Sequence, residues 1–291
     1  MEQLLTNYFI ITPARDEEKF IEKTIKSVIS QTVLPLRWII VDDGSEDSTA
    51  KIALSYAGQY SWIKVVVREN RGYRNSNGGE VEAFYHGLNL YRDCEWDYLV
   101  KLDADVSFDK NYFAGCLRYF LDNPKLGIGG GKLFSYFKGS LKFEPHPRFH
   151  VRGATKIYRK ECWNAIGGIE KMPGWDTIDE VKANMVGWQT VTFDDPVLVQ
   201  HRMTGAADSV FRSHVNRGIG CYCIGYHPLY LFVKSIKLLL AKPGIKGAVG
   251  LVYGFLQGHL KRISRIEEKD VIRYLRRQQL NRLFFRKTIW K

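Results

Sequence analysis

Short apolar runs alternate with amphipathic stretches over roughly the first half of the chain. Runs rich in β-branched and aromatic residues predict strands near residues 8–12, 38–42, 63–67 and 98–103. Apolar residues spaced three and four apart predict helices near residues 17–31, 48–57, 79–91 and 111–121. Strands that alternate with helices in this way are typical of an α/β fold, in which a mostly parallel sheet carries helices on both faces.

Acidic residues follow three of the predicted strands directly. The three strand ends read Pro13-Ala14-Arg15-Asp16-Glu17, Asp42-Asp43-Gly44-Ser45 and Asp103-Ala104-Asp105. Open α/β sheets bind ligands in the crevice beyond the carboxyl ends of their strands, so we expect these side chains to meet there. The adjacent carboxylates of Asp42 and Asp43 repel each other. They either satisfy backbone donors of a turn or accept hydrogen bonds from a nucleobase and a ribose.

Asp103 and Asp105 lie two residues apart at the end of a buried strand. Residues two apart on an extended chain share one face, so both carboxylates can point at the same position. Paired carboxylates suit a hard divalent cation, Mg²⁺ or Mn²⁺, which takes oxygen ligands and bridges to a substrate phosphate. The sequence therefore predicts a divalent-metal site at this strand end.

The three acidic strand ends, in this order and spacing, resemble the nucleotide-sugar half of a family 2 glycosyltransferase with the GT-A fold. The resemblance covers the first two-thirds of the chain. It implies a Rossmann-like sheet and inverting transfer of a sugar from a nucleotide-diphospho-sugar, with a UDP-sugar as the expected donor. It also implies that the donor is bound by a set of strand-end residues: Pro13, Ala14, Arg15, Glu17, Asp42, Asp43, Asp103 and Ala104.

Two glycine-rich segments bear on the donor site. The basic loop at residues 68–79 is either a solvated turn or, as the resemblance implies, a cover for the nucleotide in which Arg74 or Arg71 contacts the diphosphate. The segment Gly127–Lys132 has the spacing of neither a dinucleotide-binding fingerprint nor a Walker A loop. It is interpreted as a strand that approaches a ligand or another backbone closely, which disfavours dehydrogenases and P-loop enzymes.

Asp176, Asp179 and Glu180 share one face at the start of a predicted helix. They either complement the helix dipole or supply a catalytic base. Members of the resembled family carry an acidic motif, often Glu-Asp, about eleven residues before a Gly-Trp or Gly-Tyr pair, and Asp176 stands at that spacing from Gly187. Trp175 occupies the position of the usual Glu, so Asp179 and Glu180 remain rival candidates for the base.

His201 follows the last predicted strand of the sheet. It is either a structural hydrogen-bonding residue or, as the resemblance implies, a third metal ligand beside Asp103 and Asp105. Its neighbour Arg202 is a candidate phosphate contact. The Gln-x-x-Arg-Trp signature of processive polysaccharide synthases does not occur downstream, and this favours transfer of a single sugar.

Length and composition predict a large catalytic domain followed by a tail. With 291 residues and 45% hydrophobic residues, the chain can bury a full core. We expect a GT-A domain over residues 1–205, divided into a nucleotide-sugar half at 1–105 and an acceptor half at 106–205, and a helical tail over 206–291. Five cysteines without metal-binding spacing, and no signal peptide or apolar run long enough to span a membrane, favour a cytoplasmic location.

The tail combines apolar helices with positive charge. Residues 261–291 hold 11 basic and 3 acidic residues, a net charge of +8 out of +12 for the chain. Amphipathic, basic helices are typical of proteins that lie on an anionic membrane surface, here the inner face of the cell membrane, although a helical hairpin that closes over the core is the alternative. The expected acceptor is a lipid-linked glycan for cell-envelope polysaccharide or glycolipid. The rivals are a polyprenyl-phosphate sugar synthase and a nucleic-acid-binding protein; since the charge lies beside apolar helices, no nucleic-acid partner is expected.

Overall fold

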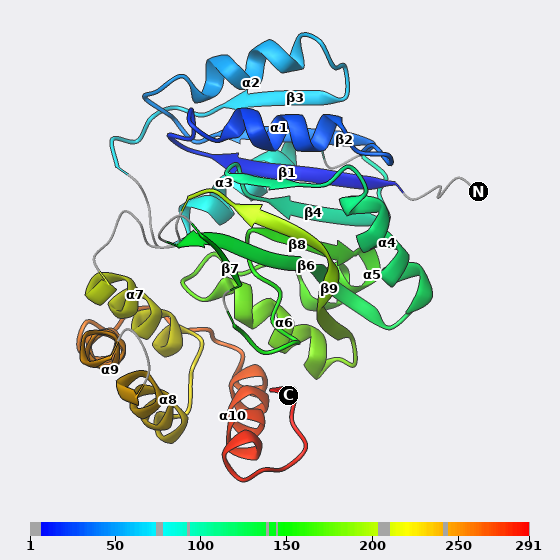
Figure 1. Ribbon diagram of the computed structural model, residues 1–291. Coiled ribbons are helices and arrows are strands. Elements are labelled where there is room, and N and C mark those ends of the chain that lie inside the picture. The colour runs from blue at the N-terminus through cyan, green and yellow to red at the C-terminus, as the bar shows by residue number, and fades with distance from the viewer. Residues whose placement is uncertain are drawn as a thin grey trace.

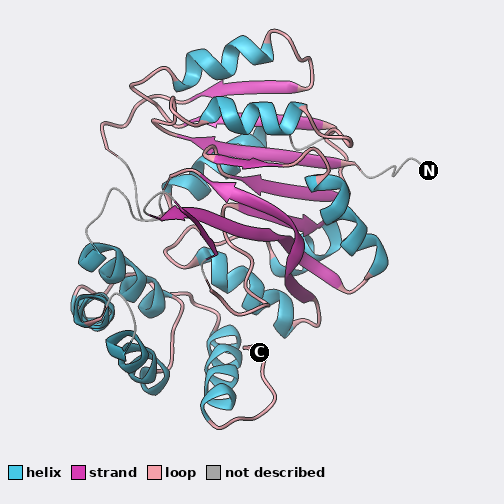
Figure 2. Cartoon of the chain, viewed as in Figure 1, coloured by secondary structure: helices cyan, strands magenta, loops and turns pink. Residues whose placement is uncertain are grey.

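A nine-stranded sheet with helices on both faces forms the larger part of the molecule (Figures 1 and 2). The computed structural model describes residues 7–73, 78–91, 94–137, 140–143, 145–202, 210–240 and 244–290. The eight elements predicted for the first part of the chain are confirmed. Their bounds are β1 Tyr8–Ala14, α1 Ile21–Ile29, β2 Arg37–Asp42, α2 Thr49–Ala57, β3 Ile63–Val67, α3 Gly79–Leu90, β4 Tyr98–Leu102 and α4 Tyr112–Asp122.

The second part of the sheet contains three elements that the sequence predicted, namely the glycine-rich strand, the helix that carries Asp176 and the strand before His201, together with others that it did not resolve. Their bounds are β5 Val106–Phe108, β6 Leu126–Phe137, β7 Ser140–Phe143, β8 Thr155–Arg159, α5 Lys160–Ile166, α6 Trp175–Met185 and β9 Gln189–Gln200. The strand order is β3-β2-β1-β4-β8-β6-β9-β5, with β7 on β6. The first four strands run parallel, whereas β8 pairs antiparallel with both β4 and β6. Carboxyl ends of β1, β2 and β4 therefore meet at one edge.

Alternate residues of each central strand enter two separate cores. Tyr8 and Ile10 pack with α1, α2 and α4 on one face, while Phe9 and Ile11 pack with α3, α5 and α6 on the other. This is the period of two that strand geometry imposes. Because both faces are covered, the central strands are mostly apolar, which explains why short apolar runs identified them in the sequence.

The glycine-rich segment forms the middle of β6, and its close approach to neighbouring chain is confirmed. A Cβ atom on Gly131 would lie 2.3 Å from the carbonyl oxygen of Pro196. A Cβ on Gly129 would lie 2.4 Å from the ring of Phe193. Glycine is therefore required here by packing between β6 and the adjoining β9, and no phosphate loop is formed.

In the described part of the chain, four helices follow the sheet; they lie below it in Figure 1 and share a core with α6. They are α7 Val210–Cys223, α8 Pro228–Leu240, α9 Ile245–Leu260 and α10 Lys269–Leu283. Gly250, Gly254 and Gly258 let α9 lie directly on α7: a Cβ on Gly254 would fall 2.0 Å from the carbonyl oxygen of Val215. Among the described residues no helix is long and apolar enough to cross a membrane. The predicted domain boundary at residue 205 falls outside the described residues.

Candidate active site

The ends of β1 and β2 bring the first group of predicted site residues together. Ala14 is the register partner of Asp42, and the backbone N–H of Asp43 donates to the carbonyl oxygen of Ala14 at 2.8 Å. The guanidinium of Arg15 donates to the carbonyl oxygen of Asp43 at 2.8 Å. Pro13 precedes this contact on β1 and is half-buried. The two strand ends thus form one continuous surface, as the sequence predicted.

Asp42 contributes an acceptor that the described part of the chain does not use. Its side chain is 1% exposed, and one carboxylate oxygen accepts from the backbone N–H of Ser45 at 3.2 Å. The other oxygen, Oδ1, is buried without a hydrogen-bond partner among the described residues. A buried acceptor left unpaired costs free energy, so this oxygen is suited to a donor group of a ligand.

Arginine residues surround Asp43. Its carboxylate forms ion pairs with Arg68 and Arg71, both from the loop after β3, and Arg71 also contacts Glu82 at 3.2 Å. Burial raises the pKa of Asp43 more than the positive charges of Arg68, Arg71 and Arg15 lower it. Several guanidinium groups therefore stand beside the strand ends, where a diphosphate could accept their hydrogen bonds. Arg74 lies outside the described residues.

Glu17 lies just beyond β1 and is 7% exposed. Its carboxylate forms an ion pair with Arg202 at 2.8 Å, and Arg202 also donates to the carbonyl oxygen of Asp16 at 2.8 Å. This contact ties the start of the chain to the residues that follow β9. Arg202 therefore lies beside the strand ends. Its guanidinium group is already paired with the carboxylate of Glu17.

Asp103 and Asp105 lie in the turn between β4 and β5, close enough for each to influence the other. Burial and the charge of Asp103 raise the pKa of Asp105 to about 7. Gln200 donates to both oxygens of Asp105 at 3.3 and 3.4 Å, while Asp103 pairs with the ammonium group of Lys101. Ala104 between them is buried. A buried carboxylate and a partly exposed one that repel each other are a suitable donor set for a divalent cation.

His201 lies beside Asp105 but its ring is engaged elsewhere. The backbone N–H of His201 donates to the carbonyl oxygen of Asp105 at 2.8 Å, whereas its Nε2 is 2.8 Å from the hydroxyl of Ser107. The ring also stacks near Phe20 and Tyr136. Within the described ranges no three His, Cys, Asp or Glu side chains gather as a metal site, so the predicted three-ligand set is not assembled.

Asp179 and Glu180, two of the three candidate bases, are completely buried in the first turns of α6. The ammonium group of Lys156 lies 2.9 Å from both oxygens of Asp179 and 2.8 Å from Glu180. Tyr158 also donates to Asp179, and the backbone N–H of Val151 donates to Glu180. These carboxylates hold α6 against β8 and the preceding segment, and their oxygens face protein groups rather than an open site.

Asp176, at the start of the same helix, is only partly buried. No hydrogen bond to its carboxylate occurs among the described residues. Burial acts to raise the pKa of Asp176, but the positive charges of His150, Lys156 and Arg152 outweigh it, and the pKa falls below its usual value. Of the three candidates, Asp176 is therefore the one whose carboxylate is partly exposed and accepts no hydrogen bond from a described residue.

A pair of buried lysines that the sequence patterns did not reveal connects Asp103 to the acidic start of α6. Lys101 on β4 is the register partner of Lys156 on β8, and the two are 1% and 0% exposed. The ring of Trp175 lies over both ammonium groups at 5.1 and 5.5 Å, and its Nε1 donates to Glu80 at 2.7 Å. The sequence did carry one signal for these residues, which is a lone lysine inside an apolar strand. Lysine side chains normally face solvent, so this signal does not by itself predict a buried pair.

One family model and several curated proteins match parts of the chain. The family model described as glycosyl transferase family 2 matches residues 9–174. A poly-beta-1,6-N-acetyl-D-glucosamine synthase of Staphylococcus epidermidis is 31% identical over 201 residues, which are 64% of this chain and 46% of that protein. The synthase of the same name from Staphylococcus aureus strain COL is 32% identical over 117 residues, 40% of this chain and 26% of that protein. The chain thus spans less than half the length of these relatives.

Solved structures share the fold at low sequence identity. A mannosyltransferase from Pyrobaculum calidifontis in complex with GDP-Man and Mn²⁺ has a TM-score of 0.56 at 16% identity, over 97% of this chain and 76% of that chain. TarS 1-349 of S. aureus in complex with UDP-GlcNAc has a TM-score of 0.54 at 16% identity, over 91% and 78%. These similarities confirm the predicted GT-A fold.

Proposed function

The chain belongs to glycosyl transferase family 2, and from this premise we propose that it is an inverting enzyme that transfers one sugar from a nucleotide-diphospho-sugar to a hydroxyl group of a lipid-linked acceptor. The product would be a cell-envelope polysaccharide or glycolipid. The names of the curated relatives, synthases of an N-acetylglucosamine polymer, support a saccharide product. The location that follows from this proposal is the cytoplasmic face of the cell membrane.

The donor would lie against the ends of β1 and β2. The unpaired oxygen of Asp42 would accept a hydrogen bond from the nucleobase or ribose, and Arg15 with Arg71 would contact the diphosphate. A UDP-sugar is the proposed donor. Support comes from TarS, whose structures are described as complexes with UDP and with UDP-GlcNAc, while the archaeal mannosyltransferase is described with GDP-Man.

Asp103 and Asp105 are the residues proposed to hold a divalent cation, with His201, whose Nε2 contacts Ser107, as the third candidate ligand. Two structural neighbours are described with Mn²⁺, which supports use of such an ion. When bound, the cation would neutralise negative charge on the nucleotide diphosphate leaving group. The negative charge of Asp103 beside the buried carboxylate of Asp105 supports this role, because a cation between them would reduce their repulsion.

Asp176 is the proposed general base. As the acceptor hydroxyl attacks the anomeric carbon on the face opposite the nucleotide, its proton would pass to the carboxylate of Asp176. The observation that carries this proposal is the contrast within α6: Asp179 and Glu180 are sealed by Lys156, whereas Asp176 is partly exposed and held ionised by surrounding positive charge. The lowered pKa favours the ionised form required of a base.

Docking of the C-terminal helices on an anionic membrane is the second element of the proposal. One face of α8 exposes Leu229, Phe232, Ile236, Leu239 and Leu240, and one face of α9 exposes Ile245, Val249, Tyr253, Leu256 and Leu260. Both sets recur at helical spacing, so each forms a stripe. Exposed apolar stripes next to a strongly basic segment match the apolar and anionic layers of a lipid leaflet.

Donor binding and product analysis test the proposed chemistry. A thermal-shift series with UDP-, GDP- and dTDP-sugars, each with Mg²⁺ or Mn²⁺, identifies the donor because a ligand of the native state raises the melting temperature. The expected result is a shift with a UDP-sugar that disappears with chelator. Inversion is read from the anomeric configuration of the product by NMR, and retention of the donor configuration would contradict the mechanism.

One alternative concerns product length. The curated relatives are named as polymer synthases, which favours repeated transfer, whereas this chain lacks the Gln-x-x-Arg-Trp signature. Mass spectrometry of products formed with excess donor separates single-sugar transfer from polymerisation. A second alternative, a polyprenyl-phosphate acceptor, needs little base catalysis and would leave the available carboxylate of Asp176 without a role.

A further inference from the structure

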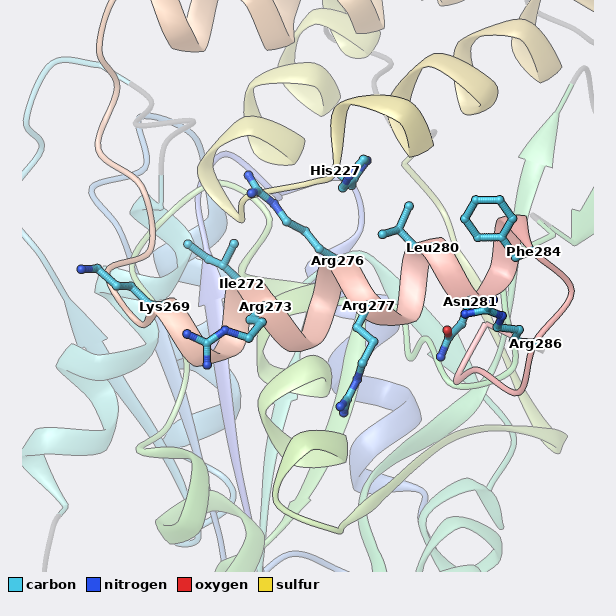
Figure 3. A pocket seen from close by; sticks show the side chains of 10 residues that line it. All are labelled: His227, Lys269, Ile272, Arg273, Arg276, Arg277, Leu280, Asn281, Phe284 and Arg286. Atoms are coloured by element: carbon cyan, nitrogen blue, oxygen red, sulfur yellow. The ribbon is translucent and has the colours of Figure 1, made fainter.

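A groove with a volume of about 610 Å³ runs along α10, away from the strand-end carboxylates. Figure 3 shows its wall in two rows on the helix: Ile272, Arg276 and Leu280 face His227, and Arg273 and Arg277 project on the other side. Each row follows the four-residue spacing that places side chains on one helical face. The groove is therefore formed by α10 and by the segment between α7 and α8 that carries His227.

The charge of the groove is almost entirely positive. Its lining includes Lys269, Arg273, Arg276, Arg277 and Arg286. Among the described residues, the one carboxylate that pairs with these cations is Asp270, which contacts Arg273 at an exposed position. An accumulation of cations with a single anionic partner creates a positive potential that a bound anion would relieve.

Positive charge also lies behind the groove, where Arg265 and Arg276 are partly buried next to each other. Arg276 donates to the carbonyl oxygen of Gly225, and burial together with the charge of Arg265 lowers the pKa of Arg276. The Nε atom of Arg265 is itself buried without a hydrogen-bond partner in the described part of the chain. Burial and the charge of Arg276 also lower the pKa of His227. Like charges are thus held together by the fold beside the groove.

Apolar side chains stand between the cations. Ile272, Leu280 and Phe284 line the same groove, and Phe284 is 58% exposed. A small inorganic anion would use the cations and leave these side chains in water. A nucleic acid would be served by several exposed aromatic rings that stack on successive bases, whereas Ile272 and Leu280, the apolar side chains between the arginines, are aliphatic. The combination fits an anion that carries hydrocarbon.

We propose that the groove along α10 binds the phosphate headgroup of an anionic membrane lipid. The cations would contact the phosphate oxygens, and Ile272, Leu280 and Phe284 would contact the glycerol backbone and the first carbons of the acyl chains. This inference rests on the proposed membrane docking of α8 and α9. It adds to that docking a defined headgroup position, which would set how the protein is oriented on the leaflet.

The test compares two variants of the full chain with the same loss of charge. Lys269→Gln/Arg277→Gln removes two exposed cations that line the groove, and Arg282→Gln/Lys287→Gln removes two exposed cations that do not. Binding is measured by flotation with phosphatidylcholine vesicles with and without phosphatidylglycerol. The expected result is that the groove variant binds the anionic vesicles roughly tenfold more weakly than the control variant. Equal weakening of both variants would mean diffuse attraction and would overturn the headgroup site.

Further arms separate the sources of the phosphate and the two proposals. In thermal-shift experiments, short-chain phosphatidylglycerol should stabilise the wild type but not the groove variant, whereas an equal effect of inorganic phosphate would overturn a lipid ligand. Loss of oligonucleotide binding in the groove variant, with vesicle binding unchanged, would also overturn it. Failure of the wild type to bind any vesicle would instead refute membrane docking itself. Donor hydrolysis is expected to be unchanged in both variants.

Discussion

Replacement of Asp176 by Asn removes the proposed base while preserving the size and shape of the side chain. The structure predicts a small effect on stability, because no described residue donates a hydrogen bond to this carboxylate. The cost is the favourable interaction of a negative charge with the start of α6 and the nearby cations, of about 1 kcal/mol. For a protein of this size such a loss lowers the melting temperature by about 2–4 °C.

The expected effect on catalysis is much larger. Removal of a general base slows a reaction by roughly 10²–10⁴. At about 1.36 kcal/mol for each factor of ten, the activation barrier rises by about 2.7–5.4 kcal/mol. Because its pKa is lowered, Asp176 is ionised at every pH above the range in which carboxyl groups usually titrate. The ratio of wild-type to variant rates should therefore stay constant between about pH 6 and about pH 8, since Asp176 does not titrate in that interval.

The assay measures kcat/KM for transfer and, separately, donor binding by thermal shift. Asp122→Asn is the matched control, because Asp122 is an exposed carboxylate at the end of α4. We expect Asp176→Asn to bind the donor like the wild type and to lose transfer, and Asp122→Asn to change neither. Transfer by Asp176→Asn within about fivefold of the wild type would refute the assignment of the base.

Three further predictions concern the metal carboxylates, the buried lysine and the tail. Asp105→Ala should lower metal-dependent donor hydrolysis by at least about 10² with the fold intact by circular dichroism, and full turnover in chelator would contradict this. Lys156→Met, which removes the cation shared by the buried carboxylates of Asp179 and Glu180, should lower the free energy of unfolding in urea by roughly 3–5 kcal/mol. Lys160→Met, whose cation pairs with an exposed carboxylate, should lower it by less than about 1 kcal/mol. Phe232→Ser should weaken flotation with anionic vesicles, whereas Leu121→Ser on α4 should not; equal recovery of both variants and the wild type would contradict docking.

The first half of the sheet could be predicted from the sequence because its signals are local. Strands such as Tyr8–Ala14 are buried on both faces and are therefore continuous apolar runs, and each ends directly at the residues that form the site. Parallel pairing then brings the strand ends to one edge without further information. The positions of Asp42, Asp43 and Asp103 relative to the fold follow from this rule.

The second half could not be predicted in the same way because its signals are distant. β8 enters the sheet between β4 and β6, so the lysine at position 156 lies opposite Lys101 although 55 positions separate them. Helical spacing grouped Asp176, Asp179 and Glu180 on one face, but it could not tell which of them are buried. Lys156 decides that, because it pairs with Asp179 and Glu180 and leaves Asp176 available.

The C-terminal helices share a core with the helix that carries the proposed base. Ile178 and Val181 of α6 pack with Tyr222 of α7 and Leu275 of α10, and Lys182 of α6 forms an ion pair with Glu268 just before α10. Removal of these helices would therefore expose a core face of α6 and disturb its first turn as well as any membrane surface. Point substitutions on the outer faces of α8 and α10 leave this core intact. They are consequently the changes that can separate a role of the tail in lipid binding from its support of α6.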